Sequence, residues 1–410
     1  MIKRELVEDF FSREIRFAGI QRELKIPEIN KIVSIVGPRR AGKTWHFYSL
    51  FTTFKSPMYV NFEDLAFRNI ATEEFFDVVK IFSEIKYPPK TLFLDEVQVI
   101  KNWEVLARSL YDRGYKIFIT GSSSKLLPKE VSTELRGRSL TYILLPFNFR
   151  EFIRAKKSEI DIHTFEGKGK VLKLLKEYLT YGGYPEVTLS ENKERILKEY
   201  FDEIFYKDFV ERHKIKSLEF GRFLFEFSFQ NFSKEISLRK IKNFFGRNIS
   251  DRTLYAYVEK LQDTLTTFFV EKYSKSVYLR GSWPRKIYVC DVGISTILGF
   301  SEAMGRRMEN CVFLELLRKR NEEPSLEIYY WKEYQDREVD FVVKRGAKVE
   351  QLIQVCYDID DYDTKQREVK ALMKASEQLR CDNLLLITWD YEGKEKRVKL
   401  IPLWKWLLGA

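Results

Sequence analysis

The sequence GPRRAGKTWHF at residues 37–47 follows the apolar run KIVSIV (31–36) and precedes a pattern typical of a helix. It contains the spacing G-x-x-x-x-G-K-[ST] in full. Its glycines let successive backbone N–H groups turn toward phosphate oxygens, and the start of a helix adds partial positive charge. The residues expected to enclose a polyphosphate are Gly37, Pro38, Arg39, Arg40, Ala41, Gly42, Lys43 and Thr44. We expect Lys43 to reach the β- and γ-phosphates as a catalytic group and Thr44 to ligate Mg²⁺.

A pair of acidic residues lies in the second motif, TLFLDEVQ (91–98). Asp95 ends an apolar strand. In proteins with a phosphate loop of this kind, the Asp at that place holds Mg²⁺, usually through water. Glu96 can polarise the attacking water as a general base. The alternative is a strand that ends in two solvated acids. The phosphate loop about 50 residues upstream makes the nucleotide interpretation much the stronger one.

Two further motifs contain residues that could contact the γ-phosphate. In KIFITGSSSKLL (116–127), Ser122 or Ser123 can hydrogen-bond this phosphate or the attacking water, unless the segment is an ordinary polar strand end. In ELRGRSLTY (134–142), Arg136 and Arg138 precede a strand, where an arginine finger would stabilise transition-state charge. A structural salt bridge is the alternative there. We select Ser122 and Arg138 as the catalytic candidates.

The composition is that of a soluble globular chain. Its 410 residues exceed what one core usually serves, and they are 44% hydrophobic and 32% charged. No apolar run approaches the ~18–20 residues of a membrane span, and the charged start is unlike a signal peptide. The cysteines lack the spacing of zinc or disulfide sites, so we expect buried thiols, a cytoplasmic protein and no membrane partner.

Alternating apolar runs and helical patterns between residues 31 and 150 predict an α/β fold with a parallel sheet. The expected strands are KIVSIV, PMYVNF, TLFLDEV, KIFITGS and LTYILLPF. Residues 1–30 are interpreted as a helical lead-in. The pattern turns helical over 151–215, with a break at YGGYPEV (181–187), and residues 305–410 mix helices and strands.

The middle of the chain is basic. From Arg212 to Lys286 there are 16 Lys/Arg and 7 Asp/Glu, in a chain of net charge +11. SLRKIKNFFG (237–246) followed by NISDRTLYAYVEKLQD (248–263) predicts a helix–turn–helix, with TTFFVEKY and SVYLRG as the strands of a wing. The candidates for contact with DNA are Arg247, Arg252, Tyr255 and Lys260. A solvated basic face, or a module that only packs, is about equally compatible with this pattern.

Taken in order, the phosphate loop, LDEVQ, TGSSS, LRGRS and YGGYPEV resemble the archaeal and bacterial ATPases of the AAA+ superfamily, near its STAND branch. The resemblance covers about residues 16–300. It implies ATP as the nucleotide, a winged helix, and a helical lid in which Gly183 and Pro185 lie near the nucleotide. From the residues alone, YGGYP is a turn before a helix.

The C-terminal segment resembles the restriction-endonuclease-like domain commonly attached to these ATPases. Asp340 in REVDFVV matches the first metal-binding acid, and Glu309 is a candidate for the upstream helical acid. Gln354 and Cys356 depart from the pattern, because an acid and a lysine are expected there. Lys365 or Arg367 would have to reach in from the next helix. We therefore favour a retained scaffold that cuts nothing.

The sequence thus predicts an N-terminal lead-in (1–30), a P-loop ATPase core (31–150), a helical lid (151–215), a winged helix (216–304) and a restriction-endonuclease-like domain (305–410). The favoured function is a switch or motor that hydrolyses Mg-ATP, and DNA is a candidate for what it acts on. The alternatives are an ATP-gated DNA-processing nuclease and a nucleotide-binding signalling protein with negligible turnover. The expected ligands are ATP, ADP and Mg²⁺. The client and the oligomeric state stay open.

Overall fold

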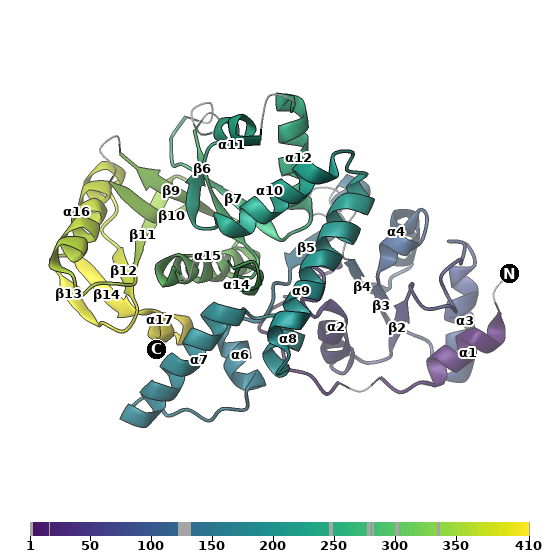
Figure 1. The fold of residues 1–410 in the computed structure, drawn as a ribbon. Helices are drawn as coiled ribbons and strands as arrows, with labels where there is room; N and C mark the ends of the chain where they lie inside the picture. Colours follow the sequence, from purple (N-terminus) through teal and green to yellow (C-terminus); the bar gives the residue numbers. More distant parts are fainter. Residues whose placement is uncertain are drawn as a thin grey trace. The chain divides into compact units, whose positions relative to one another are not determined.

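The computed structural model describes residues 3–15, 17–121, 133–245, 249–276, 280, 283–299, 303–333 and 337–409. The chain divides into two compact units, residues 1–145 and 146–410, which are drawn in Figure 1. None of the described helices has the length and apolarity that a bilayer crossing requires. The four cysteines are unpaired and buried, as expected.

A five-stranded parallel sheet forms the centre of the first unit, in the order β2-β3-β4-β1-β5. The strands are β1 (Ile32–Val36), β2 (Pro57–Asn61), β3 (Thr91–Asp95), β4 (Lys116–Gly121) and β5 (Ser139–Ile143). The helices are α1 (Arg4–Ser12), α2 (Lys43–Phe51), α3 (Phe75–Ile85) and α4 (Trp103–Asp112), with a short 3-10 turn at Val97–Val99. All five expected strands are confirmed, and every residue of β1 and β3 is buried, as in a parallel sheet covered on both faces.

The core of the first unit is rich in aromatic side chains. Phe93 on β3 stacks on Phe118 of β4, with ring centroids 4.8 Å apart. Leu24 and Ile26 from the lead-in pack against the same cluster. The lead-in is helical only in α1, because none of the described residues from Arg13 to Lys31 is helical. Pro27 accounts for part of this difference, since it disfavours helix at the residue before it.

The second unit begins with helices. They are α6 (Phe149–Ala155), α7 (Phe165–Tyr181), α8 (Pro185–Leu189), α9 (Lys193–Glu203) and a π-helical stretch at Ile204–Glu211. The start of α6 is fixed by a capping box, in which Asn148 Oδ1 accepts the Glu151 N–H at 2.8 Å and Glu151 Oε2 accepts the Asn148 N–H at 2.9 Å. The expected break at YGGYPEV falls between α7 and α8.

Helices and a three-stranded antiparallel sheet follow in the basic segment. The elements are α10 (Leu218–Gln230), β6 (Lys234–Ile236), α11 (Leu238–Phe245), α12 (Asp251–Asp263), β7 (Thr267–Glu271) and β8 (Arg285–Val289), and the sheet order is β6-β8-β7. The side chain of Ser250 caps α12, as expected. Most of the second expected strand, SVYLRG (276–281), lies outside the described residues. The partner of β7 is β8, whose residues RKIYV are almost wholly buried.

The last part of the chain builds a six-stranded mixed sheet, in the order β13-β14-β12-β11-β10-β9. Its strands are β9 (Leu326–Lys332), β10 (Glu338–Arg345), β11 (Lys348–Cys356), β12 (Leu384–Thr388), β13 (Gly393–Glu395) and β14 (Val398–Pro402). The helices here are α14 (Gly293–Ile297), α15 (Met304–Glu322), α16 (Tyr362–Leu379) and α17 (Leu403–Leu408). Figure 1 shows α16 lying along one face of this sheet.

Candidate functional site

The glycine-rich loop connects the carboxyl end of β1 to the first residue of α2. Gly42 takes a left-handed conformation with φ 93°, and Arg40 does so with φ 66°. A Cβ on Gly37 would lie 2.1 Å from the carbonyl oxygen of Leu144, so glycine is needed there for close packing. The loop therefore has a tight bend at the start of a helix, where backbone N–H groups favour an anion.

Lys43 is buried within this bend. Its Nζ donates to the carbonyl oxygens of Gly37 at 3.1 Å and Pro38 at 3.2 Å. The ammonium thus lies over the residues that the sequence assigned to phosphate binding. Only 6% of this lysine is exposed, and water competes little with its partners there.

Thr44 and Asp95 are in direct contact. Thr44 Oγ1 donates to Asp95 Oδ2 at 2.8 Å, and the phenol of Tyr59 donates to the same oxygen at 2.9 Å. The other carboxylate oxygen accepts a hydrogen bond from Thr120. Burial raises the pKa of Asp95, and the bonds from Thr120 and Thr44 act in the opposite direction. A hydroxyl and a carboxylate oxygen thus meet beside the loop, which is a donor set that suits Mg²⁺.

Glu96 follows with a left-handed backbone, φ 53°, which turns the chain sharply after β3. Its backbone N–H donates to Thr120 Oγ1 at 3.2 Å, and the amide of Gln98 donates to its carboxylate. Both the backbone and the carboxylate of Glu96 are therefore held in place. A non-glycine residue in this conformation is uncommon, and such residues cluster at functional sites.

Two residues that the sequence analysis missed complete this arrangement. Thr120 at the end of β4 bridges Asp95 and Glu96, and Tyr59 on β2 reaches Asp95 across the sheet. Arg22 fixes the loop from outside, with donors to the carbonyls of Ala41 at 2.7 Å and Leu145 at 2.6 Å. The position of Thr120 at the end of an apolar strand was a usable signal for it.

The remaining catalytic candidates are placed differently. Ser122, together with Ser123, lies outside the described residues. Arg138 directly precedes the first residue of β5, Ser139, which pairs with Ile32 at the start of β1. Arg138 therefore lies at the amino ends of these strands, whereas the loop follows the carboxyl end of β1. It lies 3.4 Å from Asp112, and the whole of β5 separates it from the edge that carries the loop. With ~3.3 Å of rise per residue, this arginine cannot act on a phosphate held by its own chain. The role of Arg138 as an arginine finger stays a prediction, and the geometry favours a phosphate held by another chain.

Gly183 and Pro185 have partners inside the second unit. The Gly183 N–H donates to Asp291 Oδ2 at 2.6 Å, and the Gly293 N–H donates to Asp291 Oδ1 at 2.8 Å. Pro185 is the first residue of α8. Burial raises the pKa of Asp291 to about 6, against these backbone hydrogen bonds. The contact of Gly183 or Pro185 with nucleotide stays a prediction, and their visible role is to shape this turn.

In the basic segment, α12 exposes Arg252 and Tyr255, and 60% of Tyr255 is accessible. Lys260 instead donates to the carbonyl of His213 at 3.0 Å and lies over the ring of Tyr257. Lys260 is thus engaged in packing, which corrects its expected place on a DNA-facing surface. Arg247 and the turn at Gly246 lie outside the described residues.

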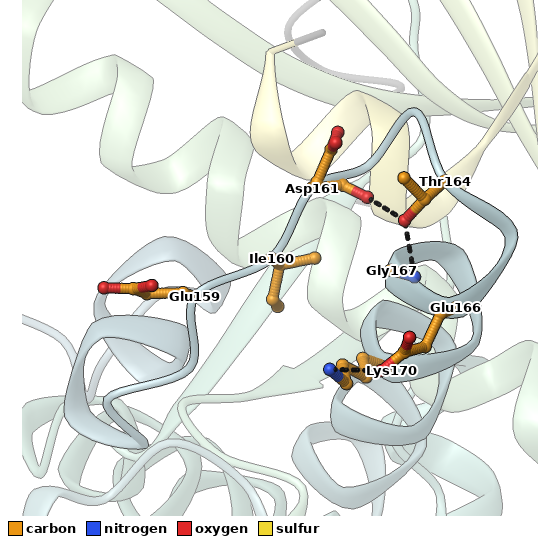
Figure 2. A pocket seen from close by; sticks show the side chains of 7 residues that line it. All are labelled: Glu159, Ile160, Asp161, Thr164, Glu166, Gly167 and Lys170. Carbon is orange, nitrogen blue, oxygen red and sulfur yellow. Dashed lines mark hydrogen bonds and ion pairs between the residues drawn. The ribbon is translucent and has the colours of Figure 1, made fainter.

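A hollow in this segment lies between α11, α12 and the strands. Its volume is about 300 Å³, and Arg239, Tyr255, Phe269, Trp283 and Arg285 are among its lining residues. Aromatic rings and guanidinium groups together suit stacking on a flat, anionic ligand. A second hollow, shown in Figure 2, contains about 450 Å³ beside the start of α7. Glu159, Asp161 and Glu166 make it acidic, so it does not suit a phosphate.

The residues at which the C-terminal segment departs from the endonuclease pattern also have defined surroundings. Gln354 Oε1 accepts the Asp340 N–H at 3.0 Å, and its amide donates to Glu368 at 2.7 Å. Cys356 is buried, and burial raises the pKa of its thiol to about 12. Lys365 pairs with Glu395 at 3.3 Å, so it does not supply the missing cation. Arg367 pairs with Glu368 at 2.7 Å.

Comparison with known families divides the chain into three matches. An AAA domain matches residues 29–153. Two domains of unknown function follow, DUF8612 over residues 172–303 and DUF4143 over residues 304–406. These matches name neither a winged helix nor an endonuclease, so both stay predictions.

Relatives extend over nearly the whole length. An uncharacterized protein of Methanocaldococcus jannaschii is 41% identical over an alignment that covers 95% of this chain and 91% of the relative. An uncharacterized protein of Haemophilus influenzae is 25% identical over 95% of this chain and 97% of its own length. Among solved structures, Cdc6p of Pyrobaculum aerophilum is 11% identical, covers 78% of this chain and 93% of its own, and has a TM-score of 0.25. The chain belongs to the family of the Methanocaldococcus jannaschii protein, and its N-terminal unit carries a P-loop ATPase domain of the AAA type.

Proposed function

We propose that this protein binds Mg-ATP at residues 37–44 and hydrolyses it, and that the nucleotide state acts as a conformational switch or motor. The observation that carries the proposal is the contact of Thr44 Oγ1 with Asp95 Oδ2 at 2.8 Å, beside the buried ammonium of Lys43. Bound Mg²⁺ supplies charge neutralisation at the phosphate oxygens. Thr44 and Asp95 would hold the ion, the latter through water.

The residues of the chain supply the other functions. Lys43 attracts and orients the terminal phosphates, and the loop N–H groups bind their oxygens. Glu96 accepts a proton from the attacking water, and Thr120 holds this acid and Asp95 in a fixed relation. An arginine from a second copy, with Arg138 as the candidate, stays a prediction for stabilising the developing charge.

Steady-state ATP hydrolysis tests the proposal. Lys43→Ala should lower kcat/KM by about 10²-fold or more, since one preorganised donor to a charged transition state contributes that much. Glu96→Gln should lower kcat by about 10²–10⁴-fold while nucleotide binding is retained. Lys86→Ala, an exposed lysine of the same unit, is the matched control and should leave the rate unchanged. A rate that does not depend on Lys43 excludes ATP hydrolysis at this loop.

A second candidate function, contact with nucleic acid, is favoured by the hollow between α11, α12 and the strands. The element order α10-β6-α11-α12-β7-β8 supports a winged helix. We expect the affinity for labelled DNA to fall steeply with salt. Arg252→Ala should reduce the slope of log K against log salt concentration by about one. Arg195→Ala, an exposed arginine on α9 whose side chain is 83% accessible, is the control. Binding unaffected by Arg252→Ala and Tyr255→Ala together removes this surface as a nucleic-acid site.

A further inference from the structure

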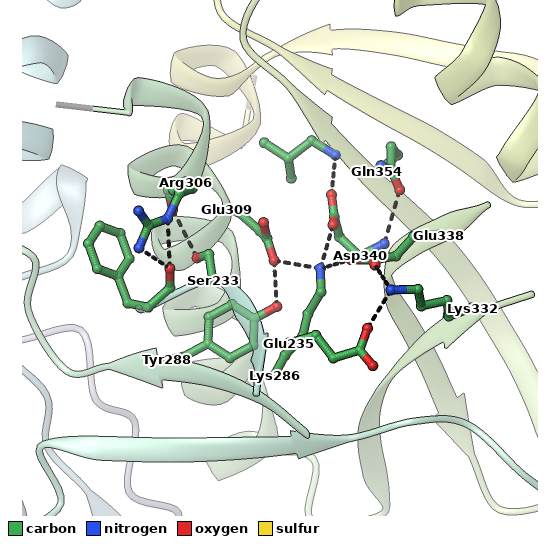
Figure 3. Close-up of polar contacts among 12 residues, drawn as sticks. Ser233, Glu235, Lys286, Tyr288, Arg306, Glu309, Lys332, Glu338, Asp340 and Gln354 are labelled. Atoms are coloured by element: carbon green, nitrogen blue, oxygen red, sulfur yellow. Dashed lines mark hydrogen bonds and ion pairs between the residues drawn. The ribbon is translucent and has the colours of Figure 1, made fainter. Parts of the chain in front are cut away.

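A buried lysine from β8 lies among the acidic residues that the sequence analysis considered for metal binding (Figure 3). Lys286 Nζ is 2.9 Å from Glu309 Oε1 on α15, 2.7 Å from Asp340 Oδ1 on β10 and 2.5 Å from Glu338 Oε1 on the same strand. Only 2% of this lysine is exposed. Three carboxylates from two elements therefore converge on one ammonium.

Two of these carboxylates have further donors. Tyr288 donates to Glu309 Oε1 at 2.7 Å, and the Val355 N–H donates to Asp340 Oδ2 at 2.9 Å. Glu309 Oε1 and both carboxylate oxygens of Asp340 are thus directed at Lys286 or at hydrogen-bond donors, in positions where a metal ion would need them. Burial alone would lower the pKa of Lys286, but the carboxylates of Asp340 and Glu309 outweigh it and the net shift is upward. The lysine is held in its charged form.

We propose that Lys286 is the permanent cation of this cluster and takes the place of a divalent metal, so the C-terminal segment does not cut nucleic acid. The cluster instead fastens β8 of the basic segment to α15 and β10. This inference does not depend on ATP hydrolysis in the first unit.

Neighbouring contacts also connect the basic segment to the C-terminal sheet. The Tyr273 N–H donates to the Tyr330 carbonyl at 2.7 Å, where the end of β7 meets β9, and the phenol of Tyr330 donates to the Pro284 carbonyl at 2.6 Å. Lys332 on β9 pairs with Glu235 on β6 at 2.5 Å. The three-stranded sheet and the six-stranded sheet are thus connected by backbone and ionic contacts, and we expect them to move as one body.

Backbone cleavage by Fe²⁺ and ascorbate tests the inference, because a bound iron ion cuts the chain next to its ligands and mass spectrometry locates the cuts. The experiment uses the full-length protein without nucleotide. Wild type should show no cuts next to Glu309 or Asp340, and Lys286→Met should gain them. Lys344→Met is the matched control, because Lys344 lies on β10, as Asp340 does, but pairs with Glu327 outside the cluster. It should behave as wild type.

Each result has a defined meaning. Cuts next to Asp340 in wild type overturn the proposal, since a metal then binds in the presence of the lysine. A folded Lys286→Met protein without such cuts also overturns it, because the lysine is then not what occupies a metal position. Lys286→Gln keeps a hydrogen-bond donor and replaces the Met variant if the latter does not fold. The wild-type measurement tests the proposal independently of either variant.

Discussion

The hydroxyl of Thr120 links the two acidic residues at the end of β3, since it donates to Asp95 and accepts the Glu96 N–H. Thr120→Val keeps the shape but leaves that N–H and carboxylate oxygen without a partner. We expect a loss of about 1–3 kcal/mol in the free energy of unfolding, measured in urea. We also expect kcat for ATP to fall about tenfold, which equals ~1.4 kcal/mol of barrier. Thr120→Ser, which keeps the hydroxyl, should restore the rate; a Ser variant as slow as the Val variant would contradict this role.

Asp291 provides a pH test, since burial raises its folded-state pKa to about 6, above its usual value of 3.8. The stabilising contribution of its proton is therefore fully present below pH 3.8 and is lost as the pH rises through about 6. Wild type should gain about 1 kcal/mol of unfolding free energy relative to Asp291→Asn between pH 7 and pH 5. Urea unfolding of both proteins at each pH measures this, and a constant difference between them would contradict it.

At the scale of elements, Gly37 fixes the end of β1 against the end of β5. Gly37→Ala should lower the free energy of unfolding by about 1–3 kcal/mol, because its Cβ would meet the backbone oxygen of Leu144. Nucleotide affinity should fall with it. Gly169→Ala is a control of opposite sign: that glycine lies exposed within α7 with open space around it, so alanine should stabilise by about 0.5–1 kcal/mol. Equal effects of the two changes would exclude the steric explanation.

The elements that could be predicted from the sequence are those whose signal is local. The five strands of the first unit are continuous apolar runs, and the phosphate loop is a contiguous motif, so both were found. The strand β8 was missed because RKIYV carries two basic residues at its start, and the burial of Lys286 depends on carboxylates 23 and 54 residues away. Nothing local distinguishes that lysine from a solvated one.

In the candidate site too, some residues have a local sequence signal and others are positioned only by the fold. Lys43, Thr44, Asp95 and Glu96 stand in motifs whose spacing reflects their chemistry. Tyr59 and Thr120 come from other strands, and they reach Asp95 only because the sheet order places β2 and β4 on the two sides of β3. The position of Arg138 before a strand could be predicted, but its distance from the loop could not, because that depends on the direction of β5 in the sheet.

At the scale of the whole molecule, the two compact units are residues 1–145 and 146–410. The proposed nucleotide site lies wholly in the first, whereas the lysine cluster and the contacts around it lie wholly in the second. Nucleotide binding should therefore stabilise the first unit directly. With ~0.7 kcal/mol per residue, the unfolding enthalpies should be about 100 and about 190 kcal/mol for the two units.

Scanning calorimetry can resolve this difference. Mg-ATP at 100 times its Kd raises the unfolding free energy of the unit that binds it by ~2.7 kcal/mol. This corresponds to a rise in Tm of roughly 8 °C for a unit of about 150 residues. We expect the smaller transition to move by this amount and the larger one to stay in place. Lys43→Ala should abolish the movement, while Lys286→Met should lower the larger transition alone, because it leaves buried carboxylates without their cation. A single transition that ATP and Lys286→Met both displace would show instead that the two units unfold together.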